Sequence, residues 1–227
     1  RVRATVSTGE THGLLNNDSV YMNVSPGIST TIVVKYNDYN RKLLIDPKSF
    51  VAAGVNTTTN AITISNHGYV TGDKVIHTSS IPCGGLTDNQ TYYIVVFDNN
   101  TIKLANTYYD ATDEKPPIVG ITSTSIGTIN PINPEIRLYK DCSAVFDVSD
   151  SSLSYVNQAT TYSAFNLNFY KDENFTKIWD TSTLTKDFNV VRNGAPGIST
   201  DANVTLTVTE DIPTELFYKL DPIYDSN

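Results

Sequence analysis

The chain has 227 residues, of which 39% are hydrophobic and 18% are charged, and its net charge is −8. This composition suffices for a packed core and excludes a disordered chain. The sequence predicts no membrane span, because it has no run of 18 apolar residues, and no nucleic-acid partner, because it has no basic stripe. The 30 Thr and 22 Asn residues favour strands joined by turns. Because the chain begins at Arg1 rather than at Met, we expect it to be a piece of a longer protein.

Two matched blocks near the N-terminus indicate an internal repeat. The first block reads His-Gly, four residues, Asp, one residue and Val. Its His, Gly and Asp positions in the two copies are His12, Gly13, Asp18, His67, Gly68 and Asp73. The second block is an apolar run ending in Asn and Asp, and it occurs at 32–38 and again at 94–100. We therefore predict two related small β modules, barrel-like or sandwich-like, over residues 1–60 and 61–130.

Each module has the pattern of strands joined by Asn-rich corners. Ile62 and Ile64 alternate with polar residues, which is typical of a half-buried strand. The apolar run 92–97 is followed by Asp-Asn-Asn and by a returning run at 101–104, and the same order occurs at 34–43. Asp and Asn tolerate left-handed dihedrals and bond to their own backbone, so both stretches are predicted hairpins.

The repeated His-Gly pair can be interpreted in two ways. Zinc needs three or four ligands close in space, and the chain has three histidines, His12, His67 and His77. A structural turn needs only a glycine with unusual dihedrals at the start of a strand and an aspartate that closes the corner. We interpret the motif as a structural turn.

Two prolines, Pro131 and Pro134, mark a domain boundary, and the chain beyond them has the pattern of a sandwich. Seven strands are predicted there, at 136–140, 143–148, 164–170, 176–179, 187–191, 203–209 and 215–220. Apolar and polar residues alternate at 165–169 and at 204–209, so one face of each strand is buried. Residues 131–227 are therefore predicted to form an antiparallel Ig-like or cupredoxin-like β-sandwich, and the fold class of the whole chain is all-β.

The sequence predicts no enzyme and no catalytic, cofactor-binding or metal-binding residues. The nucleophile elbow Gly-x-Ser-x-Gly, the phosphate-binding loop and the dinucleotide fingerprint are all absent. Calcium stays open as an alternative at the loop acids Asp147 and Asp150, or Asp172 and Glu173. Two cysteines, Cys83 and Cys142, can be bridged or free.

Several motifs of the second module carry a resemblance to a known family. They are Ala-Ile-Thr-Ile at 61–64, His-Gly at 67–68, Gly-Asp-Lys-Val at 72–75, Gly-Gly-Leu-Thr at 84–87, Thr-Tyr-Tyr at 91–93 and Asn-Thr-Ile-Lys-Leu-Ala at 100–105. This stretch resembles a module of tail, baseplate and fibre-associated proteins of tailed bacteriophages, especially contractile-tailed marine phages that infect cyanobacteria. Residues 146–153 and 203–209 are similar to the β domain that accompanies such modules. The first copy departs from the pattern, because Asn17 replaces the Gly before Asp18 and the Gly-Gly-Leu-Thr block is missing.

The resemblance covers about two-thirds of the chain and implies a non-enzymatic structural module of a phage virion protein. Such a module acts by protein–protein contacts or as a spacer. Its expected location is the virion, and its expected partners are other virion proteins or further copies of itself.

The alternative is a host-receptor or glycan-binding module of a phage or bacterial surface protein, located outside the cell or on its surface. Tyr rings stack on sugars, and the candidate contacts with a host-surface glycan are Tyr92, Tyr93, Tyr108 and Tyr109. Because adjacent residues of a strand face opposite sides, half of these rings are expected in the core.

Overall fold

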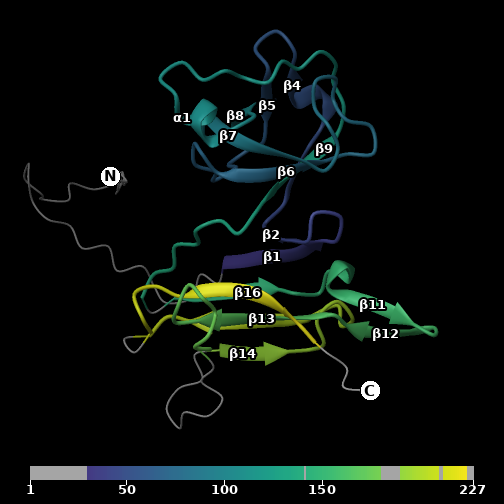
Figure 1. The fold of residues 1–227 in the computed structure, drawn as a ribbon, viewed down its shortest axis with the longest axis vertical. Helices are drawn as coiled ribbons and strands as arrows, with labels where there is room; N and C mark the ends of the chain where they lie inside the picture. The colour runs from purple at the N-terminus through teal and green to yellow at the C-terminus, as the bar shows by residue number, and fades with distance from the viewer. Residues whose placement is uncertain (1–29, 141, 180–189, 210–211, 224–227) are drawn as a thin grey trace, which may run out of the picture.

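The computed structural model describes residues 30–140, 142–179, 190–209 and 212–223, and this part of the chain is nearly all β. The predicted all-β class is therefore confirmed. The elements form two lobes that lie one above the other along the long axis of the molecule (Figure 1). We call them the insert lobe, residues 48–131, and the sandwich lobe, residues 30–45 and 143–222.

The insert lobe is built on one strongly curved sheet of seven strands in the order β3-β9-β6-β7-β8-β5-β4, and all of its pairings are antiparallel. The strands are β3 (Lys48–Phe50), β4 (Val55–Asn56), β5 (Ala61–Thr63), β6 (Lys74–Thr78), β7 (Gln90–Asp98), β8 (Thr101–Ala105) and β9 (Gly127–Pro131). A 3-10 helix, η1 (Ala52–Gly54), and a short α-helix, α1 (Tyr108–Thr112), complete the lobe.

The core of the insert lobe follows from the alternation along β7 and its neighbours. Tyr92 and Ile94 of β7 point inward and are buried, while Tyr93 and Phe97 point to the outer face. The inward residues join a single apolar cluster. Its largest members are Phe50, Ile62, Ile64, Tyr69, Leu86, Tyr92, Ile94, Ile102, Leu104, Ile121 and Ile129.

The sandwich lobe packs a five-stranded sheet, β14-β15-β10-β1-β2, against the two-stranded sheet β13-β16. The strands are β1 (Thr30–Asn37), β2 (Lys42–Ile45), β10 (Ser143–Asp147), β13 (Phe165–Tyr170), β14 (Val190–Asn193), β15 (Asn203–Thr207) and β16 (Phe217–Pro222). The two sheets meet where the Phe146 and Phe169 rings lie edge to face, with their centroids 5.3 Å apart. Trp179 is also buried in this core.

Strand pairing divides the described chain differently from the predicted modules 1–60, 61–130 and 131–227. β1 pairs in parallel with β10, with Thr30 opposite Ala144, so residues 30–45 belong to the sandwich lobe. The insert lobe therefore lies between β2 and β10 in the chain. The physical reason is that β1 buries Ile32 and Val34 in the core of the sandwich. β1 and β7, which the repeat equated, consequently lie in different sheets.

The remaining predicted residues of the first copy, His12, Gly13 and Asp18, lie outside the described residues. The repeat motif can therefore be described only in its second copy.

Two predicted strands do not form. Residues 136–140 join no described sheet, and 176–179 contribute only an isolated bridge between Tyr170 and Ile178. Of 187–191, only Val190 and Val191 are described, and they lie in β14.

A projecting hairpin was not predicted from the sequence. It consists of β11 (Ser154–Asn157) and β12 (Thr160–Ser163), follows the 3-10 helix η2 (Ser151–Leu153), and extends from one side of the sandwich lobe (Figure 1). Its turn residues, Gln158 and Ala159, have φ of 47° and 66°, which Asn and Gly usually supply. The residue types at this corner therefore gave no turn signal.

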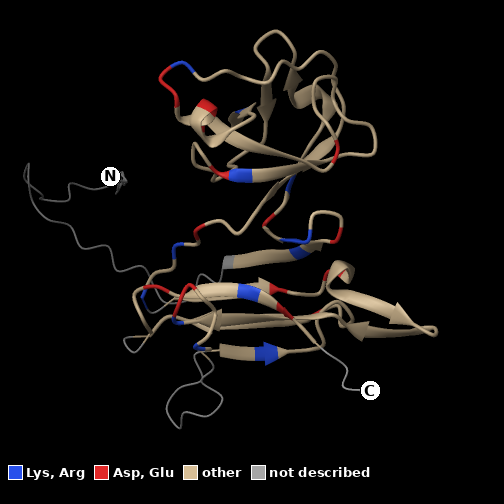
Figure 2. Ribbon diagram, in the orientation of Figure 1, with Lys and Arg blue, Asp and Glu red and all other residues tan. Residues whose placement is uncertain are grey.

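Two connections join the lobes, through residues 46–47 and 132–142. Leu44 of the sandwich lobe forms an isolated bridge with Ile132 of the second connection. The Nδ2 of Asn37 donates to the Oδ1 of Asn89 over 3.1 Å, and the Nδ2 of Asn40 donates to the backbone oxygen of Asn89 over 3.1 Å. Acidic and basic residues are interspersed over both lobes (Figure 2). The described residues include no helix that is both long and apolar enough to cross a membrane.

Candidate functional site

Metal chemistry has little support among the described residues, where no three His, Cys, Asp or Glu side chains gather closely enough to hold an ion. Cys83 is a buried free thiol in the insert lobe, and Cys142 is a half-buried free thiol beside β10. The two cysteines are therefore not joined to each other.

The loop acids considered for calcium bind the backbone of their own turns. Asp147 accepts a hydrogen bond from the Ser149 N–H over 2.9 Å, and Asp172 accepts from the N–H groups of Thr176 and Lys177. The exposed Glu173 is the neighbour of Asp172. The carboxylates of Asp147 and Asp172 therefore close corners of the sandwich lobe.

Asp150, the fourth of these acids, also has a cationic partner. It accepts from the Ser152 N–H and lies 2.9 Å from the Nζ of Lys35. Burial alone would raise the pKa of Asp150, but the hydrogen bonds from Lys35 and Ser152 outweigh it and lower the pKa. The carboxylate therefore joins η2 to β1 as a structural anion.

The described copy of the repeat motif forms the turn that leads into β6. The Tyr69 N–H donates to Nδ1 of His67 over 2.9 Å, so Nδ1 carries no proton. Nε2 then carries the proton and donates to the Asp98 backbone oxygen over 2.8 Å, and the ring stacks on Tyr69. Gly68 has a φ of 71°, and the Asp73 carboxylate accepts from the Val70 N–H. Since both ring nitrogens of His67 are occupied, this histidine has no free nitrogen for a metal.

The four candidate tyrosines separate into one core residue and an exposed series. Tyr92 is buried, and its hydroxyl accepts from the Thr87 N–H over 3.0 Å. The other three form what we call the tyrosine series: Tyr93 and Tyr108 lie edge to face at 6.4 Å, and Tyr108 and Tyr109 at 6.1 Å. Tyr109 is 84% exposed. The structure therefore brings Tyr93, Tyr108 and Tyr109 together and excludes Tyr92.

A glycine of the repeat motif makes room for the tyrosine series. Gly72 has a φ of 96°, and a Cβ on it would lie 2.8 Å from Cε2 of Tyr108. Helix α1, which carries Tyr108 and Tyr109, begins where the side chain of Thr107 accepts from the Asp110 N–H, and it buries Ala111. The turn before β6 and the cap of α1 together fix the position of Tyr108.

The same outer face carries a groove of about 350 Å³, which we call the lysine groove. It is lined by Val95, Val96, Phe97, Lys103, Lys115, Pro116 and Ile118. The Lys103 ammonium lies 5.4 Å from the centroid of the Phe97 ring. The wall formed by 115–118 is held beside β8 by the Val119 N–H, which donates to the Leu104 oxygen over 2.8 Å.

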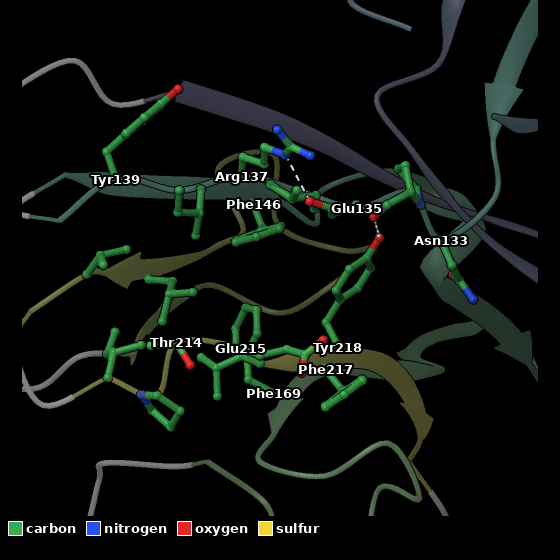
Figure 3. A pocket seen from close by; sticks show the side chains of 18 of the residues that line it. Asn133, Glu135, Arg137, Tyr139, Phe146, Phe169, Thr214, Glu215, Phe217 and Tyr218 are labelled. Atoms are coloured by element: carbon green, nitrogen blue, oxygen red, sulfur yellow. Dashed lines mark hydrogen bonds and ion pairs between the residues drawn. The ribbon is translucent and has the colours of Figure 1, made fainter. Parts of the chain in front are cut away.

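A larger groove of about 980 Å³, the sandwich groove, lies in the other lobe between residues 133–139 and 212–218 (Figure 3). Phe146 and Phe169 lie at its floor, and the ion pair of Arg137 with Glu135 lies at its rim over 2.9 Å. Tyr218 crosses one end and donates its hydroxyl proton to the Pro134 oxygen over 2.6 Å. Burial raises the pKa of Tyr218, so its phenol stays protonated and keeps this bond.

One wall of the sandwich groove is the segment 135–138, which pairs with no strand of the described residues. Along residues 135–138, Glu135 and Arg137 are exposed while Ile136 and Leu138 face the core. No backbone hydrogen bond joins residues 135–138 to any other backbone group in the described ranges. The segment thus has the alternation of a strand, and its main-chain groups have no backbone partner within the described part of the chain.

His77, the third histidine, lies fully buried in β6. Its Nδ1 lies 3.2 Å from the Thr87 backbone oxygen, and its ring stacks on Phe50. Nε2 is buried without a hydrogen-bond partner among the described residues. Burial lowers the pKa of His77, and the Thr87 carbonyl and the Asp88 carboxylate oppose this only in part. The folded chain therefore holds His77 neutral.

This burial predicts a loss of stability in mild acid. Below the pKa of about 6.5 that a histidine has in the unfolded chain, the unfolded chain binds a proton at His77 and the folded chain does not. The free energy of unfolding therefore falls as the pH falls, by up to about 1.4 kcal/mol per pH unit. The fall ends below the lowered folded pKa. Urea unfolding between pH 7.5 and 5 measures the effect. We expect the free energy of unfolding to depend more steeply on pH in the wild type than in His77→Leu. Parallel curves for the two proteins would contradict it.

Comparison of the chain with protein-family models, with curated proteins and with solved structures gave no match. The fold and the grooves define only a class of protein: an all-β protein in which a seven-stranded lobe is inserted into a sandwich, with a surface groove on each lobe.

The lysine groove was missed in the sequence because its two lysines come from separate segments. Lys103 occupies an outward position of β8, between the inward Ile102 and Leu104, and this alternation is a signal the sequence does contain. Nothing in the sequence places Lys115 beside it.

Proposed function

We propose that the chain is a non-enzymatic structural module of a phage virion protein, in a tail, baseplate or fibre, that acts by protein–protein contacts. The family resemblance of the second-module motifs supports this role. The observation that carries the proposal is the sandwich groove, whose wall includes the segment 135–138, a segment that pairs with no strand among the residues described.

The proposed contact is the addition of one strand from a neighbouring virion protein. An extended partner segment would pair its main chain with residues 135–138 and place alternate apolar side chains toward Ile136 and Leu138. Such a partner strand would pair main-chain groups for which the described residues supply no backbone partner. A groove of about 980 Å³ is large enough for several side chains of such a segment.

The two connections between the lobes support an additional role as a spacer. A lobe held at both of its ends, and further held by the Asn37 and Asn40 bonds to Asn89, rotates less freely than one on a single linker. The insert lobe would then stand at a defined position above the sandwich lobe.

Arg137→Pro tests the strand addition without altering the groove floor. Proline removes the main-chain N–H, while the side chain it replaces is 82% exposed. Arg137→Ala is the matched control, since it removes the same side chain and keeps the N–H. In particles purified from the phage that encodes the chain, we expect the proline variant to be incorporated about tenfold less than the alanine variant, as measured by quantitative mass spectrometry.

Equal thermal unfolding of the two variants would show that both are folded. Equal incorporation of both variants would refute strand addition at 135–138. Absence of the parent protein from purified wild-type particles would refute the virion role itself.

A further inference from the structure

We propose that the outer face of the insert lobe binds a carboxylated sugar, such as a uronic or sialic acid unit within a glycan. Lys103 and Lys115 bind the carboxylate in the lysine groove, and the tyrosine series stacks on adjoining sugar rings. This site goes beyond the structural role and does not depend on it.

The charge of the lysine groove argues for an anionic ligand. Lys103 and Lys115 both line it, and neither forms an ion pair with any carboxylate among the described residues. Two nearby acids accept hydrogen bonds from backbone groups: Asp113 accepts from the Lys115 N–H over 2.9 Å, and Asp98 accepts from the Asn100 N–H over 2.8 Å. Two lysine side chains without carboxylate partners among the described residues thus line one small groove, in a chain whose net charge is −8.

The size of the groove argues for a small anionic unit. A volume of about 350 Å³ lies at the lower end of the range of small-molecule sites. The apolar part of its lining, Val95, Phe97, Pro116 and Ile118, suits the C–H face of a sugar ring, and the two lysines of the lining supply the charge that a carboxylate would pair with.

The tyrosine series extends the same face beyond the groove. Tyr93, Val95 and Phe97 are alternate residues of β7 and project to one side, about 7 Å apart. The series thus begins next to the groove and continues to Tyr108 and Tyr109, whose rings are 53% and 84% exposed. Exposed rings held by edge-to-face contacts lose little freedom on binding, which favours stacking on sugar units that follow the charged one.

A glycan explains this surface better than a single-stranded nucleic acid does. Nucleic-acid platforms combine aromatic rings with a continuous basic track for the phosphates. Here Lys103 and Lys115 line one small groove, while the helix and the loop after it carry Asp110, Asp113 and Glu114. The described part of this face therefore provides a place for one anionic group rather than a track for successive phosphates.

The test is binding of the chain to a glycan array that carries uronic-acid and sialic-acid oligosaccharides, together with their carboxyl-methyl esters. We expect dissociation constants near the millimolar range for acidic glycans, and binding about tenfold weaker for the uncharged esters. The strongest acidic glycan is then titrated in NMR experiments against the variants.

Each lysine contributes part of the charge recognition. Lys103→Gln and Lys115→Gln should each weaken binding of the acidic glycan about threefold. The matched control is Lys42→Gln, since Lys42 is an exposed strand lysine of the sandwich lobe. That variant should bind like the wild type.

The exposed Tyr109 tests the stacking. Tyr109→Ser should weaken binding of the acidic glycan and of its ester by the same factor, about fivefold. Binding of none of the carboxylated glycans, equal binding of acids and esters, or tighter binding of single-stranded DNA than of any glycan would overturn the proposal. The Arg137 variants change the sandwich lobe and not this face of the insert lobe. The strand-addition proposal and the glycan proposal are therefore tested independently.

Discussion

Replacing Gly85 with alanine should lower the free energy of unfolding of the insert lobe by about 4 kcal/mol. Gly85 has a φ of 90°, and a Cβ there would lie 1.9 Å from the backbone oxygen of Gly120. Because the obstacle is backbone, no rotation of a side chain relieves it. The two segments are also tied together, since the Thr122 N–H donates to the Gly84 oxygen over 2.8 Å. Urea unfolding followed by circular dichroism measures the loss.

The control for this prediction is the other glycine of the same contact. A Cβ at Gly120 would meet no atom within 4 Å, so Gly120→Ala should change the free energy of unfolding by less than about 1 kcal/mol. Similar losses in both variants would contradict the steric explanation. A larger loss for Gly85→Ala would show that the second Gly of the Gly-Gly-Leu-Thr block is required by its backbone conformation and by its contact with the backbone of Gly120.

The second large effect is expected at His67. His67→Ala removes the acceptor of the Tyr69 N–H, removes the donor to the Asp98 oxygen and leaves a cavity beside the Tyr69 ring. An unsatisfied buried donor and a lost ring each cost on the order of 1–3 kcal/mol, so we expect a total loss of about 3 kcal/mol. Urea unfolding near pH 7.5 measures it.

His67→Phe separates the two contributions. Phenylalanine keeps a ring against Tyr69 but leaves the Tyr69 N–H and the Asp98 oxygen without their partner, so its loss should be smaller, at about 2 kcal/mol. A loss below about 1 kcal/mol in His67→Ala would mean that the turn does not depend on this histidine.

The local pattern of the sequence was sufficient to predict several strands. The alternation of Phe165, Leu167 and Phe169 places these side chains on one face, and β13 spans Phe165–Tyr170. The turn at 98–100 joins β7 to β8, because Asp98 closes it by accepting from the Asn100 N–H. In these places a side-chain period of two and a corner with its own hydrogen bonds act within a few residues.

Pairings between distant residues could not be predicted in the same way. The alternation of Ile32 and Val34 is equally compatible with any sheet, and only the core of the sandwich, with Phe146 on the adjacent β10, selects the parallel pairing. Residues 136–140 have the pattern of a strand, yet no described strand pairs with them. A strand needs a partner as well as a pattern.

The candidate site was predicted in part. Placing Tyr92 and Tyr93 on opposite sides of one strand follows from the period of two, and the structure buries Tyr92 while Tyr93 faces outward. The approach of Tyr108 to Tyr93 depends on Gly72, and the approach of Lys115 to Lys103 depends on the bond between Val119 and Leu104. Both are long-range contacts, which residue spacing does not encode.

The insertion of one lobe between β2 and β10 also has a consequence for synthesis. The ribosome releases β1 before the whole of the insert lobe, and β10, its parallel neighbour, comes only afterwards. The insert lobe is formed by one continuous segment, so we expect it to fold first. During that time the edge of β1 that later pairs with β10 remains without this partner. Chaperone protection or an early partner strand would matter most in that interval.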